Sequence, residues 1–217
     1  PVSYILTVVF ICTLVNAYNL IDGVDGLASS LGLVASIIYG SLFAFNGNMQ
    51  WAILAFSFGA SLLAFLRFNL FKAKIFLGDN GSMLIGAAVA CFGLKFINLV
   101  PDGSSVTVGI AITLLPVFDL FRVFVTRILK GRSPVSGDRT HIHHLLSVLG
   151  LKAPQISVLL SSVCLTLFGV SQVMEGFSNS TIVFFLTLLA VCFNVTIVLI
   201  IRYRYSQKQR RQLAYPS

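Results

Sequence analysis

A short polar segment early in the chain carries side chains that could hold a metal or a phosphate: Asn16, Asn19, Asp22 and Asp25. They recur at every third position, so in a helix they would form one slowly drifting polar stripe. Gly23 and Gly26 predict that the helix ends among them, which would free backbone N–H groups beside the carboxylates. Polar groups at a helix end within an apolar stretch are costly and usually functional. The alternative is an asparagine–aspartate cap and turn that only closes a helix.

A second polar segment, residues 78–82, has the sequence GDNGS. Its two glycines flank Asp79 and allow close approach of the backbone to a ligand. Asn80 or Ser82 is expected to cap a following helix, whose N-terminal N–H groups and dipole form a ready phosphate site. An ordinary turn followed by a cap is the other reading of this segment.

The third polar segment, residues 132–144, combines arginines, a carboxylate and three imidazoles: Arg132, Asp138, Arg139, His141, His143 and His144. Guanidinium and imidazole groups at this density suit an anionic ligand such as a diphosphate. The His-x-His-His pattern is also compatible with zinc, although no cysteine joins it. A solvated loop with incidental histidines is the third reading.

The elements that position these segments are long apolar helices. Hydrophobic residues make up 57% of the 217 positions and charged residues 10%, with a mean hydropathy of +0.93. A soluble domain usually has about 25% charged residues, so this chain cannot cover itself with polar side chains. Apolar runs of the length that crosses a bilayer are predicted at residues 1–18, 27–45, 51–66, 82–99, 106–125, 156–174 and 181–201. The sequence therefore predicts an all-α, polytopic membrane protein with about seven transmembrane helices.

The basic residues predict how these spans are oriented. Alternating spans place all 15 lysines and arginines except Lys95 on one side, which is the cytoplasm by the positive-inside rule. The three polar segments, a cytoplasmic loop at 126–155 and a basic tail at 206–217 then share that side. The net charge of +8 is explained by topology and contact with membrane lipid, so no nucleic-acid partner is expected. Hard oxygen ligands beside a cationic loop at a membrane face suit a Mg²⁺-bound diphosphate and phosphoryl transfer.

Three stretches, NAYNLIDGVDGLA, KIFLGDNGSMLIG and PVFDLFRVFVTRILKGRSPVSGDRTHIHHLL, resemble signature segments of the polyprenyl-phosphate N-acetylhexosamine-1-phosphate transferases. The HIHH form is similar to the undecaprenyl-phosphate GlcNAc-1-phosphate branch of that family. The resemblance implies transfer of a sugar-1-phosphate from a UDP-N-acetylhexosamine to undecaprenyl phosphate in the bacterial cytoplasmic membrane, with release of UMP. It also implies a Mg²⁺ cofactor, with Mn²⁺ as a substitute, and a role in starting a lipid-linked surface glycan such as O-antigen.

The resemblance also implies roles for individual residues. Asn19 and Asp79 match residues that approach the metal, while Asp25, Phe76 and Asn69 match residues near the nucleobase. Arg139 and the three histidines match the loop that meets the diphosphate, and Asp119 matches a supporting position in that region. We therefore assign the catalytic centre to Asp22, Asp25, His141, His143 and His144. Substrate binding is assigned to Asn16, Asn69, Phe76 and Arg139, and metal binding to Asn19 and Asp79.

The chain departs from the family pattern in one respect. The family has an adjacent pair of aspartates on an early cytoplasmic loop, and no Asp-Asp pair occurs here. We therefore expect residues 1–205 to be the C-terminal seven spans of one transmembrane transferase domain, and the chain to be part of a longer one. An ion- or proton-coupled transporter is the alternative function, and a non-catalytic membrane scaffold is a third. A transporter should carry its ionisable groups near the bilayer midplane, whereas here they gather at one face.

Overall fold

The computed structural model describes residues 2–129, 131 and 141–214, and the described part of the chain contains eight α-helices. They are α1 (Val2–Ile21), α2 (Leu27–Phe45), α3 (Met49–Asn69), α4 (Gly78–Leu99), α5 (Ser104–Leu129), α6 (Ile142–Val148), α7 (Ala153–Val173) and α8 (Asn179–Ala214). All except the short α6 include a stretch long and apolar enough to cross a membrane, which gives seven candidate spans. The predicted all-helical, seven-span architecture is confirmed.

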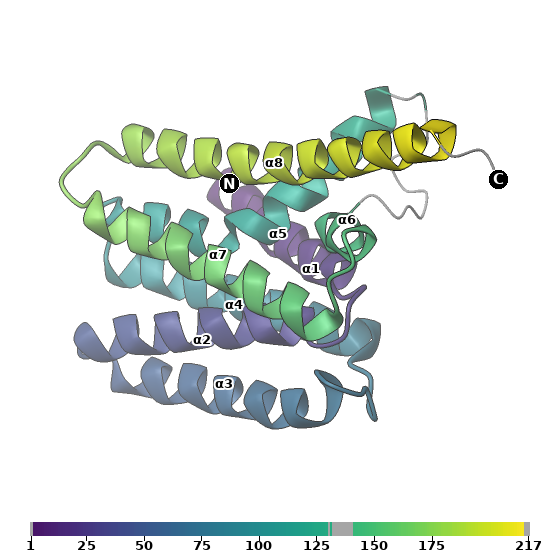
Figure 1. The fold of residues 1–217 in the computed structure, drawn as a ribbon. Coiled ribbons are helices and arrows are strands. Elements are labelled where there is room, and N and C mark those ends of the chain that lie inside the picture. The colour runs from purple at the N-terminus through teal and green to yellow at the C-terminus, as the bar shows by residue number, and fades with distance from the viewer. Residues whose placement is uncertain (1, 130, 132–140, 215–217) are drawn as a thin grey trace.

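The long helices form an elongated bundle in which α3 and α8 lie at opposite edges (Figure 1). α2 packs against α3, α4 and α7, while α5 packs against α1, α7 and α8. The core between them contains Tyr39, Phe43 and Phe92, whose rings contact one another. Helices α1, α3 and α5 all end at the end of the bundle where α6 lies (Figure 1). We call this the polar end, and it contains Asp22, Asp79 and His143.

The close crossing of α1 and α4 depends on Gly86. A Cβ atom at this position would lie 2.6 Å from the carbonyl oxygen of Leu14 and 2.8 Å from the Cα of Val15. Real Cβ atoms do not approach a backbone so closely, so only glycine permits this contact. The crossing brings the last turn of α1 beside the first turn of α4, where two of the three polar segments lie.

The predicted apolar spans were too short at both of these turns, although α1 does end just before Gly23, as the glycines predicted. α1 continues through Asn16 and Asn19 to Ile21, and α4 begins at Gly78 rather than Ser82. The expected cap at Asn80 or Ser82 is therefore wrong. The Ser82 hydroxyl lies inside the helix and donates to the carbonyl oxygens of Gly78 (3.2 Å) and Asp79 (3.0 Å). A polar residue can remain helical at a span end when a neighbouring helix supplies its hydrogen bonds, and an apolar-run criterion does not detect this.

The remaining spans also extend beyond their predicted limits. α3 is 21 residues long rather than a short span, and α8 runs on through the predicted basic tail as far as Ala214. In the predicted loop 126–155, α5 occupies the first residues and α6 forms near the end. α7 then begins at Ala153, where the backbone N–H of Lys152 donates to Gln155 Oε1 at 2.8 Å.

Candidate active site

The first two polar segments meet through Asn19. Its side-chain Nδ2 donates to Asp79 Oδ1 at 3.3 Å and to Ser82 Oγ at 3.1 Å. Asp79 is exposed, Asn19 is half-buried, and Ser82 is fully buried beneath them. The exposed carboxylate of Asp79 is therefore held by Asn19 of α1, which is itself hydrogen-bonded to buried Ser82 of α4.

The turn between α1 and α2 places two more carboxylates at the polar end. Asp22 is half-buried and Asp25 is exposed. The backbone of the turn is fixed from the other side by Ser157 of α7, whose hydroxyl donates to the carbonyl oxygen of Asp25 at 3.4 Å. Burial raises the pKa of Asp22 to about 7, and the nearby carboxylates of Asp25 and Asp79 add to the rise. The polar end thus gathers negative charge that a cation would stabilise.

The histidine segment reaches this acidic turn through His143. The ring of His143 is 1% exposed and packs directly on Gly23, where any Cβ atom would overlap Nε2. It stacks on His141 with ring centroids 5.7 Å apart, and its ring centroid lies 4.2 Å from that of His144. Gly23 is therefore required for the close approach of the first and third segments.

His143 is a neutral imidazole in this environment. Burial lowers its pKa to about 4, and the neighbouring His144 lowers it further. Neither of its ring nitrogens has a hydrogen-bond partner among the described residues. The sequence predicted a cationic loop, but at neutral pH His143 does not supply a positive charge, and its ring nitrogens are available for hydrogen bonds.

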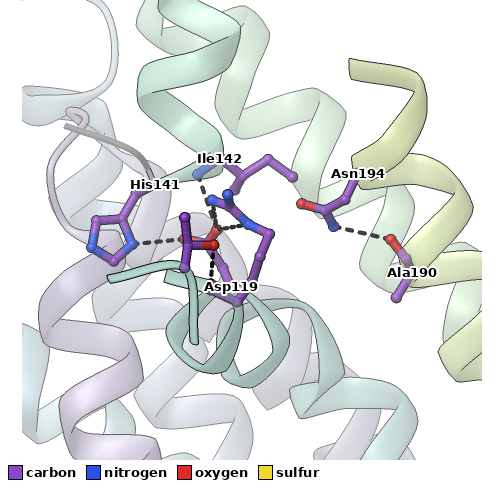
Figure 2. Close-up of polar contacts among 7 residues, drawn as sticks. Asp119, His141, Ile142, Ala190 and Asn194 are labelled. Atoms are coloured by element: carbon purple, nitrogen blue, oxygen red, sulfur yellow. Dashed lines mark hydrogen bonds and ion pairs between the residues drawn. The ribbon is translucent and has the colours of Figure 1, made fainter. Parts of the chain in front are cut away.

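Asp119 of α5 anchors the histidine segment (Figure 2). Its carboxylate is 2% exposed and lies 2.8 Å from Nδ1 of His141 through Oδ2. Oδ1 accepts the backbone N–H of Ile142 at 3.0 Å and an N–H of Arg122 at 2.7 Å. Because a carboxylate only accepts, the hydrogen of His141 lies on Nδ1 when the ring is neutral, which leaves Nε2 as its acceptor nitrogen.

The donor set at the polar end fits Mg²⁺ better than zinc. Asp22, Asp25 and Asp79 supply the carboxylate oxygens that Mg²⁺ prefers together with waters and phosphates. Within residues 2–129, 131 and 141–214, no three His, Cys, Asp or Glu side chains converge as ligands of one metal ion, and this holds for the three carboxylates as well as for the histidines. As placed, Asn19 points its amide nitrogen at Asp79. It could join a metal only if the amide turned to present its oxygen.

The other predicted substrate-binding residues that the structure describes take no part in the hydrogen bonds given above. Asn69 is buried, and its Nδ2 donates to the carbonyl oxygen of Ile75 at 2.8 Å, so it braces the connection before α4. Phe76 is 76% exposed at the end of that connection, where its ring face is free to stack. Asn16 is exposed, and its Nδ2 donates within its own helix to the carbonyl oxygen of Cys12. Arg139 lies outside the described residues.

Comparison with known proteins bears directly on this arrangement. Residues 1–97 match the sequence profile described as glycosyl transferase family 4, and this stretch includes the joined Asn19 and Asp79. The chain belongs to glycosyl transferase family 4. The resemblance read from the three polar segments is confirmed at the level of the family.

Several relatives in this family have informative names. The chain is 34% identical over 165 residues to the undecaprenyl-phosphate alpha-N-acetylglucosaminyl 1-phosphate transferase of Escherichia coli K12, covering 74% of this chain and 45% of the relative. The Salmonella typhi protein of the same name is 33% identical, with coverages of 81% and 49%. A probable undecaprenyl-phosphate N-acetylglucosaminyl 1-phosphate transferase of Bacillus subtilis is 33% identical, with coverages of 79% and 48%. The chain spans about half the length of these relatives.

Membership in the family and the seven candidate spans agree with each other. The chain is a multi-pass membrane protein with bacterial relatives. The polar end gathers the residues that the family resemblance assigned to metal and catalytic roles.

Asp119 was the residue that sequence reasoning placed least well. Its contacts with His141 and Ile142 join positions 22 and 23 residues apart along the chain, and no local spacing rule predicts them.

Proposed function

We propose that this protein transfers N-acetylglucosamine-1-phosphate from UDP-GlcNAc to undecaprenyl phosphate at the cytoplasmic face of a bacterial membrane, releasing UMP. The observation that carries the proposal is the convergence of two polar segments and the histidines of a third at one end of a membrane bundle. Asn19 contacts Asp79 and Ser82, and Gly23 contacts His143. The names of the relatives supply the substrates.

In the proposed reaction, an oxygen of the lipid phosphate forms a bond to the sugar-linked phosphorus of the nucleotide sugar. The bond from this phosphorus to the bridging oxygen of the diphosphate breaks, and its electron pair leaves with that oxygen on UMP. Both substrates are anionic, so the protein's main task is to position them and to offset their repulsion. A polar end beside lipid allows the acceptor to enter from the bilayer and the nucleotide to enter from water.

The roles proposed for individual residues follow from their surroundings. Asp79, with Asp22 and Asp25, would hold Mg²⁺, which supplies charge neutralisation at the diphosphate. His143, neutral and buried against the acidic turn, would form a hydrogen bond with a substrate group. Asp119 would hold His141 with its Nε2 lone pair available to a substrate group. Phe76 would stack on the uracil ring, and Arg139 would meet the diphosphate.

The proposal is tested with UDP-GlcNAc labelled in the sugar and added undecaprenyl phosphate, using membranes that contain the protein. We expect label to enter the organic phase only when both the lipid acceptor and Mg²⁺ are present. Membranes carrying Asp79→Asn at equal abundance are the control and should show little transfer. Transfer that is independent of undecaprenyl phosphate would contradict the proposal.

A further inference from the structure

The connection between α3 and α4 borders an open cavity, lined by exposed side chains, that the candidate active site does not use. The cavity has a volume of about 410 Å³ and is lined by Arg67, Phe68, Phe71, Lys72 and Lys74. None of these residues has a role in the reaction proposed above. The cavity lies at the polar end of α3, the helix at one edge of the bundle (Figure 1).

The backbone of this connection is folded so that the cavity has defined walls. The N–H of Lys74 donates to the carbonyl oxygen of Phe68 at 2.9 Å, which turns the chain back toward the last turn of α3. Buried Asn69 holds the same turn from inside through its 2.8 Å bond to the carbonyl oxygen of Ile75. These two bonds bring the residues before and after the helix end together around one space.

The charge of the cavity is uncompensated within the described part of the chain. Three cationic side chains line it and no carboxylate does. The ion pairs found among the described residues join Asp119 to Arg122 and to His141, so they do not involve Arg67, Lys72 or Lys74. Three like charges around a space of this size repel one another and favour an anion between them.

The apolar part of the lining indicates where that anion comes from. Phe68 is 51% exposed and Phe71 is 74% exposed, both beside the cationic groups. α3 packs its buried face on α2, and Arg67 and Phe68 lie away from that face. Exposed aromatic rings beside lysine and arginine at the end of a membrane span lie at the level of lipid headgroups. A phospholipid offers both a phosphate for the cations and acyl chains for the rings.

We propose that this cavity binds the phosphate group of an anionic phospholipid from the adjoining leaflet. Arg67, Lys72 and Lys74 surround the phosphate, and Phe68 and Phe71 contact the upper part of the acyl chains. Binding here would fix the edge helix α3 and its connection to α4 against the headgroup layer. The proposal requires only that the protein lies in a membrane, and it does not depend on the transferase reaction.

The test is native mass spectrometry of the detergent-solubilised protein titrated with phosphatidylglycerol or phosphatidylcholine. The variant Arg67→Gln/Lys72→Gln/Lys74→Gln removes the cations of the cavity. The variant Lys208→Gln/Arg210→Gln/Arg211→Gln removes the same number of charges from the C-terminal stretch and is the matched control. Each basic residue near an anionic lipid surface contributes about 1 kcal/mol, so loss of three weakens binding on the order of 100-fold.

We expect the wild type and the control to bind phosphatidylglycerol in preference to phosphatidylcholine, and the cavity variant to lose that preference. If the triple variant does not fold, the exposed single substitution Lys72→Gln should still weaken binding roughly fivefold. Equal losses in the cavity variant and the control would overturn the proposal, because the effect would then be one of net charge. Displacement of the lipid by UMP would also overturn it and assign the cavity to a soluble nucleotide.

Discussion

At the scale of single residues, the candidate site is a set of side chains whose environments differ sharply. Asp79 is exposed and accepts a hydrogen bond from Asn19, Asp22 is half-buried with a raised pKa, and His143 is buried and neutral. The residue types were predictable from the sequence because polar groups stand out in an apolar chain. Their protonation states were not predictable, because those depend on burial and on neighbours from other helices.

Asp79→Asn should lower kcat for sugar-phosphate transfer by about 100-fold or more, since a lost anionic metal ligand removes several kcal/mol of transition-state stabilisation. The measurement is transfer rate against Mg²⁺ concentration in membranes with equal protein content. Asn80→Ala, at the neighbouring exposed position on the same helical turn, is the control and should remain active. Near-normal activity of Asp79→Asn at ordinary Mg²⁺ would remove Asp79 from the metal site.

Asp119→Asn should release His141 from its fixed tautomer and lower kcat more than it changes KM. It should also lower the free energy of unfolding by roughly 1–3 kcal/mol, because the ion pair between buried Asp119 and Arg122 is lost. The chain has 3 histidines, so ¹⁵N-histidine NMR can follow each ring. The wild type should show one histidine held as the Nδ1–H form, and this signal should disappear in the variant. An unchanged tautomer signal together with unchanged kcat would show that Asp119 does not position His141.

The lowered pKa of His143 makes stability depend on pH in a defined direction. In the unfolded chain this histidine takes up a proton near its ordinary pKa of about 6.5, whereas in the folded protein it does so only near 4. Stability is therefore fully present above about pH 6.5 and falls as the pH is lowered toward 4. The Tm of the wild type should drop more between pH 7 and pH 5 than that of His143→Gln. Equal drops would mean that His143 is not buried as a neutral ring.

At the scale of helices, the sequence predicted which segments cross the membrane but not where they end. Apolar run length identified all seven spans because bilayer thickness sets a minimum length. It failed at Asn19 and at Gly78, because polar residues at both helix ends are still helical, and Asn19 and Ser82 are hydrogen-bonded to each other across the two helices. It also did not predict α6, whose first backbone N–H, that of Ile142, is bound by Asp119 of another helix. Such tertiary partners have no signature in local spacing.

The approach of α1 to α4 gives a prediction at this scale. Gly86→Ala should push the two helices apart, because its Cβ would meet the backbone of Leu14 and Val15. We expect a lower Tm and a loss of activity through the broken contact between Asn19 and Asp79. Gly169→Ala is the matched control, since a Cβ at this position of α7 has nothing within 4 Å. If both variants behave alike, helix propensity rather than close packing governs position 86.

At the scale of the whole molecule, the distribution of basic residues and the fold place the candidate site at the same end of the bundle. The first two polar segments meet the histidines of the third there, while Lys95, the one basic residue predicted on the other side, lies with its Nζ 5.5 Å from the ring centroid of Trp51. We expect this end to face the cytoplasm under the positive-inside rule.

A cysteine introduced at exposed Asn80 should resist an impermeant thiol reagent in intact cells and react in inverted vesicles, in a background where the 4 native cysteines are replaced. Labelling of position 80 from outside would reverse the orientation.

The central claim is that the polar end transfers a phosphosugar rather than a sugar alone. The most direct measurement uses UDP-GlcNAc labelled with ³²P in the sugar-linked phosphate, with undecaprenyl phosphate as acceptor. We predict that the label moves into the lipid product in equal amount to the UMP released, and that Asp79→Asn abolishes both. Label that remains in released UDP, or that never enters the lipid, would contradict the account.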